Sequence, residues 1–170
     1  MIHVTPLSKL DETLARSGAR HLVTLMKEGD NFSCPASLES ADHLMLHMHD
    51  IVEEMPGLVA PSHGHVSELL DFARRWDRRT PLAINCYAGI SRSTAAAYIV
   101  AAALSPNRDE MELARELRDL SPSATPNIRL IALADVLLGR NGRMIDAIRS
   151  IGRGCDAFEG APFVIRLLDH

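Results

Sequence analysis

Short hydrophobic runs punctuate the first half of the chain and predict its strands. Mainly apolar stretches lie at 2–5, 21–25, 43–48 and 82–86, and each has the length of a buried strand. Segments rich in glycine, proline and polar residues separate them, as expected for turns and loops. A last stretch at 163–168 predicts an edge strand or an extended segment.

Longer segments between these runs follow the period of a helix. One apolar stripe at helical spacing comes after Ser62 and consists of Val66, Leu69, Leu70 and Ala73. Ser8, with Asp11 three residues later, predicts the start of a helix that ends near 17–18. Residues 93–104 are apolar nearly all round, which predicts a helix buried in the middle of the fold.

The later part of the chain is expected to be mostly helical. Helices are predicted over about 108–120, 126–139 and 143–151. Asn107 is expected to cap the first of them and Thr125 the second, because their side chains can accept a hydrogen bond from the first helical turn.

The order of these elements predicts one α/β domain over residues 1–170. Strands alternate with helices early and helices cluster late. This order favours a central, mostly parallel sheet of four to five strands with helices on both faces. A length of 170 residues and a hydrophobic content of 46% suit one domain with a substantial core.

Charge and composition exclude several classes of function. The net charge is −4 and the pI is near 6.0, so there is no electrostatic reason to expect binding to nucleic acid or to an anionic membrane. No apolar run approaches the roughly 20 residues needed to span a bilayer, and the N-terminus has no signal-peptide pattern. Three widely spaced cysteines do not suggest a disulfide framework, so we expect a cytoplasmic protein.

The candidate chemistry lies on the short loop between the fourth hydrophobic run and the helix after it. The loop reads Asn-Cys-Tyr-Ala-Gly-Ile-Ser-Arg-Ser from Asn85 to Ser93, so Cys86 lies where a strand ends and Arg92 closes the loop before a helix. Backbone N–H groups at a helix N-terminus lack partners and carry partial positive charge. A short loop of such groups holds a phosphate well.

The side chains on this loop suit the attack of sulfur on a bound oxyanion. The loop amides favour the thiolate of Cys86, which is the nucleophilic form of the side chain. Arg92 can grip two phosphate oxygens, Gly89 permits a backbone conformation that a side chain would forbid, and Ser93 can place a hydroxyl near the sulfur. The other two cysteines have no arginine at this offset. A buried structural thiol is the alternative interpretation of Cys86.

The run from Cys86 to Ser93 resembles the signature of the cysteine-dependent protein tyrosine phosphatases, which is cysteine, five residues, arginine, and then serine or threonine. Chain length and loop position resemble the small dual-specificity branch, and the run itself resembles small bacterial members. The resemblance is strong over 50–104 and looser elsewhere. It implies a phosphatase fold and hydrolysis of phosphate monoesters, with a phosphotyrosine or dual-specificity phosphoprotein substrate, a cysteinyl-phosphate intermediate and no cofactor.

The resemblance also implies roles for single residues. Cys86 is the expected nucleophile, Arg92 the clamp on the transferred phosphoryl group, and Ser93 the hydroxyl that eases departure of the sulfur. Backbone amides of the loop are expected to bind the phosphate oxygens, and the residues concerned are Tyr87, Ala88, Gly89, Ile90, Ser91 and Arg92.

A general acid must protonate the leaving group of a phosphate monoester. In the family this acid is an aspartate on a loop ahead of the cysteine, and Asp50, which ends the third strand, matches that placement best. Glu53 and Glu54 are the alternatives. The same residue is expected to activate the water that hydrolyses the cysteinyl-phosphate.

Asn85 departs from the family, which usually has a histidine just before the cysteine. Asparagine can donate and accept hydrogen bonds, so Asn85 is expected to support the loop. The departure motivates a second hypothesis, a phosphate- or phosphoprotein-binding module with little turnover. A third is a rhodanese-like or arsenate-reductase-like thiol enzyme, although neither Cys34 nor Cys155 has an obvious resolving position.

Five histidines gather in the sequence around Asp50, and they are His43, His47, His49, His63 and His65. The chain lacks the two-histidine helical spacing and the closely spaced cysteines that are typical of zinc sites, so no metal is expected. The histidines are instead expected to lie at strand ends or around the pocket.

The expected partner is a phosphorylated protein or a small phosphomonoester, and the oligomeric state is left open.

Overall fold

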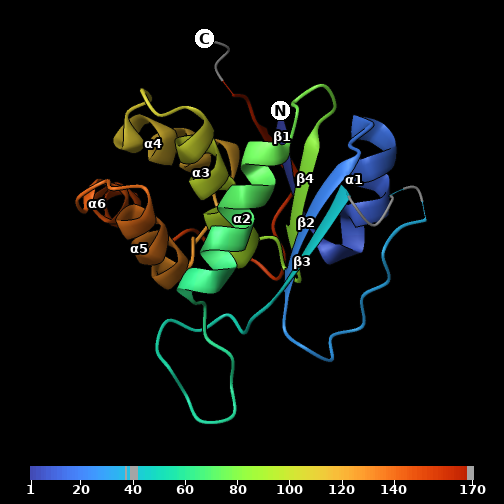
Figure 1. Cartoon of the computed structure of the whole chain (residues 1–170), viewed down its shortest axis with the longest axis horizontal. Helices are drawn as coiled ribbons and strands as arrows, with labels where there is room; N and C mark the ends of the chain where they lie inside the picture. The colour runs from blue at the N-terminus through green and yellow to red at the C-terminus, as the bar shows by residue number, and fades with distance from the viewer. Residues whose placement is uncertain (37, 39–41, 168–170) are drawn as a thin grey trace.

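The computed structural model describes residues 1–36, 38 and 42–167. Its centre is a five-stranded sheet in the order β3-β2-β4-β1-β5 (Figure 1). The strands are β1 (Ile2–Pro6), β2 (His21–Met26), β3 (His43–His47), β4 (Leu82–Cys86) and β5 (Phe163–Ile165). Neighbouring strands run parallel, except that β5 pairs with β1 in the antiparallel direction. The predicted mostly parallel sheet is therefore confirmed.

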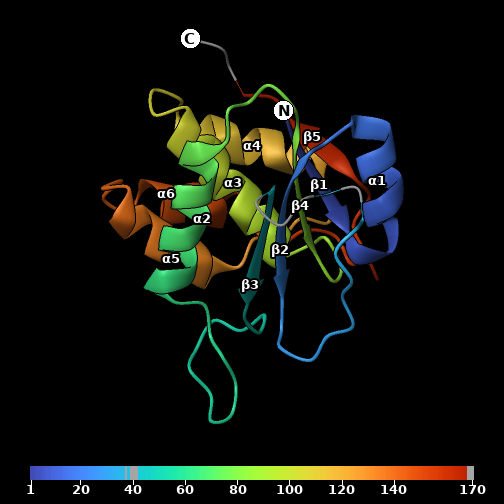
Figure 2. The same cartoon turned by 45° about the vertical axis from the view of Figure 1, so that its right-hand side comes forward.

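Helices cover both faces of this sheet, as predicted, but unequally. Figure 1 shows α1 alone on one side of the sheet and the other helices on the opposite side, and the turned view in Figure 2 agrees. A short 3₁₀ turn, η1 (Leu7–Lys9), leads into α1 (Leu10–Ser17). The larger layer consists of α2 (His63–Arg75), α3 (Arg92–Leu104), α4 (Glu110–Leu120), α5 (Ile128–Leu137) and α6 (Arg143–Ser150).

Successive residues of each strand point to opposite faces of the sheet, and this alternation sets up the site. On β4, Ile84 and Cys86 belong to the large core beneath α2–α6, whereas Ala83 belongs to the small core beneath α1. Asn85 therefore faces the α1 side. The side chains of Asn85 and Cys86 lie on opposite faces of the sheet, although they are neighbours in the chain.

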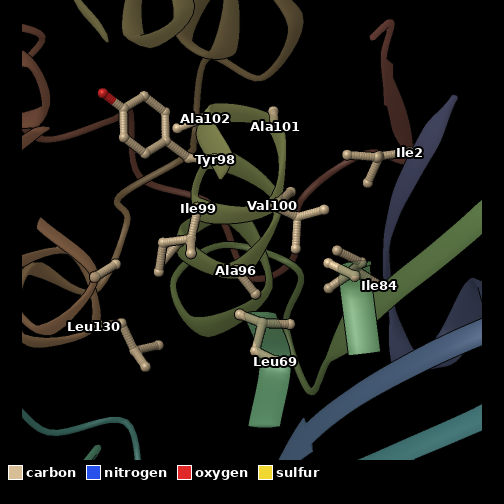
Figure 3. Packing of buried hydrophobic residues seen from close by; sticks show 14 of the residues in the cluster. Ile2, Leu69, Ile84, Ala96, Tyr98, Ile99, Val100, Ala101, Ala102 and Leu130 are labelled. Carbon is tan, nitrogen blue, oxygen red and sulfur yellow. The ribbon is translucent and has the colours of Figure 1, made fainter. Parts of the chain in front are cut away.

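The helix α3 lies in the middle of the large core, as its apolar sequence predicts, and nearly all of its residues are buried. Alanines at many of its positions allow neighbouring elements to pack closely against it. Figure 3 shows Val100 on the side of Ile84 from the sheet and Ile99 on the side of Leu130 from α5. This packing fixes the N-terminus of α3, and therefore Arg92, relative to the end of β4.

Two predicted helix starts near the sheet are wrong. Ser8 lies inside η1 instead of capping a helix, and its hydroxyl donates to Glu159 at 2.7 Å. Asp109, not Asn107, caps α4 through a 2.9 Å bond from the amide of Glu112. In both cases the residue expected to cap the helix, Ser8 or Asn107, lies in a turn that precedes the helix.

The predicted start of α5 is also wrong. Asn127 is the cap, and its side-chain oxygen accepts from the amides of Arg129 and Leu130, both at 3.1 Å. Thr125 is drawn into a tertiary contact, because its backbone amide donates to the carbonyl of Ile90 at 2.9 Å.

The ends of the other elements agree closely with the sequence pattern. Ser62 caps α2, and the predicted stripe on that helix is buried. β5 is shorter than the predicted stretch at 163–168, and Leu168 lies outside the described residues. None of the helices that the structure describes has the length and apolar character that a bilayer crossing needs.

Candidate active site

The loop that follows β4 is held from outside through its carbonyl groups. Backbone N–H groups from three distant segments donate to them, namely Leu7 to Tyr87 (3.1 Å), Gly160 to Ala88 (2.8 Å) and Thr125 to Ile90 (2.9 Å). Carbonyls that point outward in a tight loop leave the amide N–H groups to point inward. The amide of Gly89 does so, since it donates to the sulfur of Cys86 at 3.3 Å.

Gly89 is a position where only glycine fits. Its φ is +68°, in the left-handed region, and a Cβ on it would lie 2.7 Å from the backbone nitrogen of Pro6. A side chain here would therefore push the loop away from the end of β1. The close approach keeps the loop compact around the sulfur.

Cys86 places its sulfur inside this loop. Its side chain is 2% exposed, and Sγ lies 3.0 Å from the hydroxyl oxygen of Ser93 in the first turn of α3. Because the hydroxyl can donate a proton, it can stabilise a negative charge on sulfur. The structure thus brings together Cys86, Gly89 and Ser93, three of the residues that the sequence singles out.

Arg92 reaches from the start of α3 to the end of β3. Its Nη1 donates to the carbonyl of Met48 at 2.9 Å, and its Nε is buried without a partner among the described residues. An unpaired buried N–H donor is costly unless an acceptor fills the place. Arg92 therefore has donor capacity left for an anion.

A cavity of about 450 Å³ opens beside Arg92. Its lining comes from the segments that follow β2, β3 and β4 and consists of Lys27, Asp30, His49, Asp50, Tyr87 and Arg92. The predicted cation, the predicted acid and one residue of the loop therefore share one hollow. This is also where the carboxyl ends of parallel strands place ligands in open α/β sheets.

Asp50 is fixed through one of its two carboxylate oxygens. Oδ1 accepts from the hydroxyl of Ser91 at 2.7 Å and from the side-chain amide of Asn127 at 2.8 Å. The second oxygen has no protein donor within the described part of the chain, and Asp50 lines the cavity. One oxygen is thus held and the other is free to exchange a proton.

The two alternative acids lie elsewhere. Glu54 forms an ion pair with Arg129 at 2.9 Å and lines a different cavity. Glu53 is exposed and does not line the cavity beside Arg92. Of the three candidate carboxylates, only Asp50 faces the hollow that Arg92 faces.

Comparisons with solved structures identify the architecture. DUSP15 has a TM-score of 0.59 to the chain at 15% identity, over 88% of this chain and 89% of that one. PTP-2 phosphatase of Cydia pomonella has a TM-score of 0.60 at 16% identity, over 79% and 84%. Tk-PTP has a TM-score of 0.53 at 22% identity, over 82% and 90%. The chain has the fold of a tyrosine or dual-specificity phosphatase.

Sequence comparisons do not add to this assignment, since no protein-family model and no curated protein sequence matches the chain significantly. At such low identities the solved structures show the fold alone. The resemblance to bacterial members of the phosphatases stays a prediction.

Asn127 is a residue of this phosphatase fold that sequence reasoning missed. Besides capping α5, it donates its side-chain amide to Asp50 and, at 3.3 Å, to the carbonyl of Ile51. Its own backbone amide donates to the carbonyl of Ser91 at 3.3 Å. Asparagine at a helix start is a recognisable signal, but nothing local in the sequence indicates its link to Asp50.

Asn85 is held by a chain of hydrogen bonds on the α1 face. The hydroxyl of Thr24 donates to its side-chain oxygen at 2.8 Å, and Nε2 of His43 lies 3.1 Å from the same hydroxyl oxygen. Because Thr24 uses its proton on Asn85, His43 must donate through a protonated Nε2. Burial lowers the pKa of His43, which favours its neutral form. Asn85 thus fixes the backbone just before Cys86 from the α1 face of the sheet.

Two more of these histidines, His49 and His65, have separate positions. His49 lines the cavity, as expected for a residue around the pocket, and its Nδ1 accepts from the amide of Val59 at 3.0 Å. His65 completes the cap of α2 together with Ser62. Within the described ranges, no three histidine, cysteine or acidic side chains come together as metal ligands would.

Proposed function

We propose that the protein is a phosphatase that hydrolyses phosphate monoesters through a cysteinyl-phosphate intermediate. The observation that carries the proposal is the sulfur of Cys86 inside a loop whose amide at Gly89 points at it, with Arg92 and Asp50 around an adjoining cavity. A thiolate, a fixed set of donors and an acid are the groups that this chemistry needs.

In the first step the loop amides and Arg92 bind the non-bridging oxygens of the substrate. Sγ of Cys86 attacks phosphorus, so a sulfur–phosphorus bond forms while the bond to the ester oxygen breaks. Asp50 transfers its proton to the leaving oxygen, which departs as an alcohol or a phenol. The phosphoryl group is then covalently attached to Cys86.

In the second step water replaces the sulfur. Asp50, now a carboxylate, takes a proton from the water as its oxygen attacks phosphorus, and the sulfur–phosphorus bond breaks. The hydroxyl of Ser93, 3.0 Å from Sγ, donates to the departing sulfur and lowers the cost of its negative charge. The products are inorganic phosphate and free enzyme.

Replacement of the nucleophile tests this proposal. Cys86→Ser should abolish release of phosphate from a small aryl phosphate, because a serine hydroxyl is not ionised in this loop. Cys155→Ser is the matched control, since Cys155 is an exposed free thiol and should be dispensable. A Cys86→Ser variant with wild-type turnover would exclude this cysteine as the nucleophile.

The substrate class rests on analogy and on loop composition. One neighbour of the same fold, PTPMT1, is described in complex with PI(5)P, at 14% identity. The loop from Tyr87 to Ser91 in this chain contains no lysine, which disfavours heavily phosphorylated head groups. We therefore favour a phosphotyrosine-containing or dual-specificity phosphoprotein over an inositol lipid.

Asn85 favours a second candidate function, a phosphoprotein-binding module with little turnover. The side-chain nitrogen of Asn85 is buried without a partner in the described part of the chain, so one donor group just before Cys86 makes no hydrogen bond there. Asn85→His should raise turnover if the asparagine limits catalysis. Binding of a phosphopeptide by the wild-type protein without any release of phosphate would favour the binding module.

A further inference from the structure

Exposed hydrophobic side chains gather on the loop that follows Asp50. The structure describes ten large hydrophobic residues that are exposed, and four of them lie on the loop of residues 50–61, namely Val52, Met55, Leu58 and Val59. A fifth, Tyr87, lines the cavity itself. Figure 1 shows this loop projecting from the body of the molecule between β3 and α2. Exposed apolar groups that cluster in this way mark interaction sites.

One arginine fixes both limbs of the 50–61 loop. Arg129 donates from Nη1 to the carbonyl of Val52 at 3.4 Å, from Nη2 to Glu54 at 2.9 Å, and from Nε to the carbonyl of Pro61 at 2.7 Å. It therefore binds both limbs of the loop. Since the limbs are fixed, the apolar side chains at the tip stay in water and cannot collapse onto the protein, which is unfavourable unless a partner covers them.

A second cavity of about 500 Å³ lies under the tip of this loop. Its apolar lining comes from Met55, Pro56, Leu58, Ala60 and Pro61, and Arg129 closes one side. The volume is large enough for one apolar side chain of a partner. Asn127, which donates to Asp50, lies two residues before Arg129, so Asp50 and this cavity both contact the N-terminal end of α5.

The charge of the loop decides between kinds of partner. It carries the acidic residues Asp50, Glu53 and Glu54 and contains no lysine or arginine. An anionic lipid surface would be repelled by these carboxylates. A polypeptide could place an apolar side chain in the cavity. A basic side chain of the same polypeptide could pair with Glu53, which is exposed.

We propose that the 50–61 loop docks a phosphorylated polypeptide, with an apolar side chain of the substrate in the cavity under Met55 and Leu58 and a basic side chain facing Glu53. The inference rests on the proposed function, because the phosphate of the same polypeptide must reach Arg92. Beyond the proposed function, it specifies which side chains the substrate carries beside its phosphorylated residue.

Kinetics on matched substrates test this inference. One phosphotyrosine peptide carries leucine and lysine close to the phosphorylated residue, a second has serine in place of both, and a small aryl phosphate has no flanking chain. For the wild-type protein, kcat/KM for the first peptide should exceed that for the second by about tenfold or more, the factor expected when one apolar side chain is buried.

Two variants separate docking from catalysis. Met55→Gln/Leu58→Gln should remove most of the preference between the peptides and leave hydrolysis of the aryl phosphate unchanged. Leu120→Gln/Val136→Gln removes two exposed hydrophobic side chains on α4 and α5 and should leave the preference intact. An equal loss on all three substrates in the loop variant would overturn the inference, because the loop would then merely support catalysis.

Binding measurements keep the inference testable if turnover is absent. A failure of the wild-type protein to hydrolyse any of the substrates would contradict the proposed function. In that case fluorescence anisotropy with both peptides on Cys86→Ser, with and without the two loop substitutions, still reports on docking. Equal affinity for the two peptides would overturn the inference. So would a loop-dependent dimer in sedimentation experiments, or loop-dependent binding to vesicles of anionic phospholipid.

Discussion

At the scale of single residues, Asp50 shows how a carboxylate can be oriented and still remain reactive. Its carboxylate accepts two hydrogen bonds within the described part of the chain, both at Oδ1, from Ser91 in the loop after β4 and from Asn127 at the start of α5. Two donors from different elements fix the plane of the carboxylate. The other oxygen can then exchange a proton with the substrate or with water.

Asp50→Asn should lower kcat for a phosphate monoester by about 10²- to 10⁴-fold, the usual contribution of a positioned acid. Asparagine keeps an oxygen that can accept from Ser91 and Asn127, so the fold should be retained.

The control for this prediction is Glu53→Gln, assayed with a small aryl phosphate, because Glu53 lies outside the cavity. It should leave kcat unchanged. If Asp50→Asn keeps the wild-type kcat and the control loses it, the assignment of the acid is wrong.

Asn85 illustrates support from the opposite face of the sheet. It cannot touch the sulfur of Cys86, because neighbouring residues of a strand point to opposite sides. Its side-chain oxygen is tied to Thr24, which is itself tied to His43. Both Thr24 and Asn85 are fully buried, so their hydrogen bond is not exchanged with water.

Thr24→Val should lower the free energy of unfolding by about 1–3 kcal/mol, because it leaves the buried oxygen of Asn85 without a donor. Urea denaturation measures the effect. The double variant Thr24→Val/Asn85→Leu should recover part of the loss, since both polar partners are then gone. A single variant as stable as the wild type would show that this hydrogen bond contributes nothing.

At the scale of elements, the loop after β4 depends on segments from both ends of the chain. The turn after β1 and the stretch before β5 each donate one amide to it, from Leu7 and Gly160. Gly160 approaches so closely that a Cβ on it would lie 2.7 Å from the carbonyl oxygen of Gly89. The segment before β5 therefore packs directly against the loop.

Gly160→Ala should reduce kcat/KM by about tenfold or more, because the added Cβ displaces either the loop or the amide that binds Ala88, and 1.4 kcal/mol of lost positioning corresponds to tenfold. Gly64→Ala is the control. A Cβ at Gly64 meets only the hydroxyl of Ser62, at 3.6 Å, so activity should be unchanged. Wild-type kcat/KM in Gly160→Ala would show that the contact does not shape the loop.

At the scale of the whole molecule, partly buried histidines couple stability to pH. Burial is the main cause that lowers the pKa of His3, His43 and His65 from the ordinary value of 6.5. As the pH falls, the unfolded chain therefore binds these protons before the folded protein does. Their contribution to the free energy of unfolding is complete above about pH 6.5 and is lost progressively below it.

His65→Gln tests this coupling at one position. Glutamine can still accept from the backbone at Ser62, as in other capping boxes, but it does not titrate. The free energy of unfolding, measured by urea denaturation, should therefore fall less for the variant than for the wild type between about pH 7.5 and about pH 5.5. An equal fall in both proteins would show that His65 does not contribute.

Much of the architecture could be predicted because it follows from local periodicity. The run at 82–86 and the apolar helix after it are found where the sequence places them, and the signature from Cys86 to Ser93 fixes the loop between them. The start of α5 could not be predicted in this way. Thr125 also has a local signal, but its hydroxyl donates to the carbonyl of Ser123 and accepts from the amide of Gly154, and the cap is Asn127.

The sequence by itself determined the sheet, the buried helix and the candidate nucleophile and cation, because hydrophobic period and residue spacing act over a few neighbouring positions. Only the tertiary structure decided which carboxylate shares a cavity with Arg92, which amides support the loop, and that the apolar side chains of 50–61 remain in water. These features depend on contacts between segments far apart in the chain, such as Arg129 with Val52 and Gly160 with Ala88. No local pattern records such contacts, since they form only when the sheet brings its strand ends together.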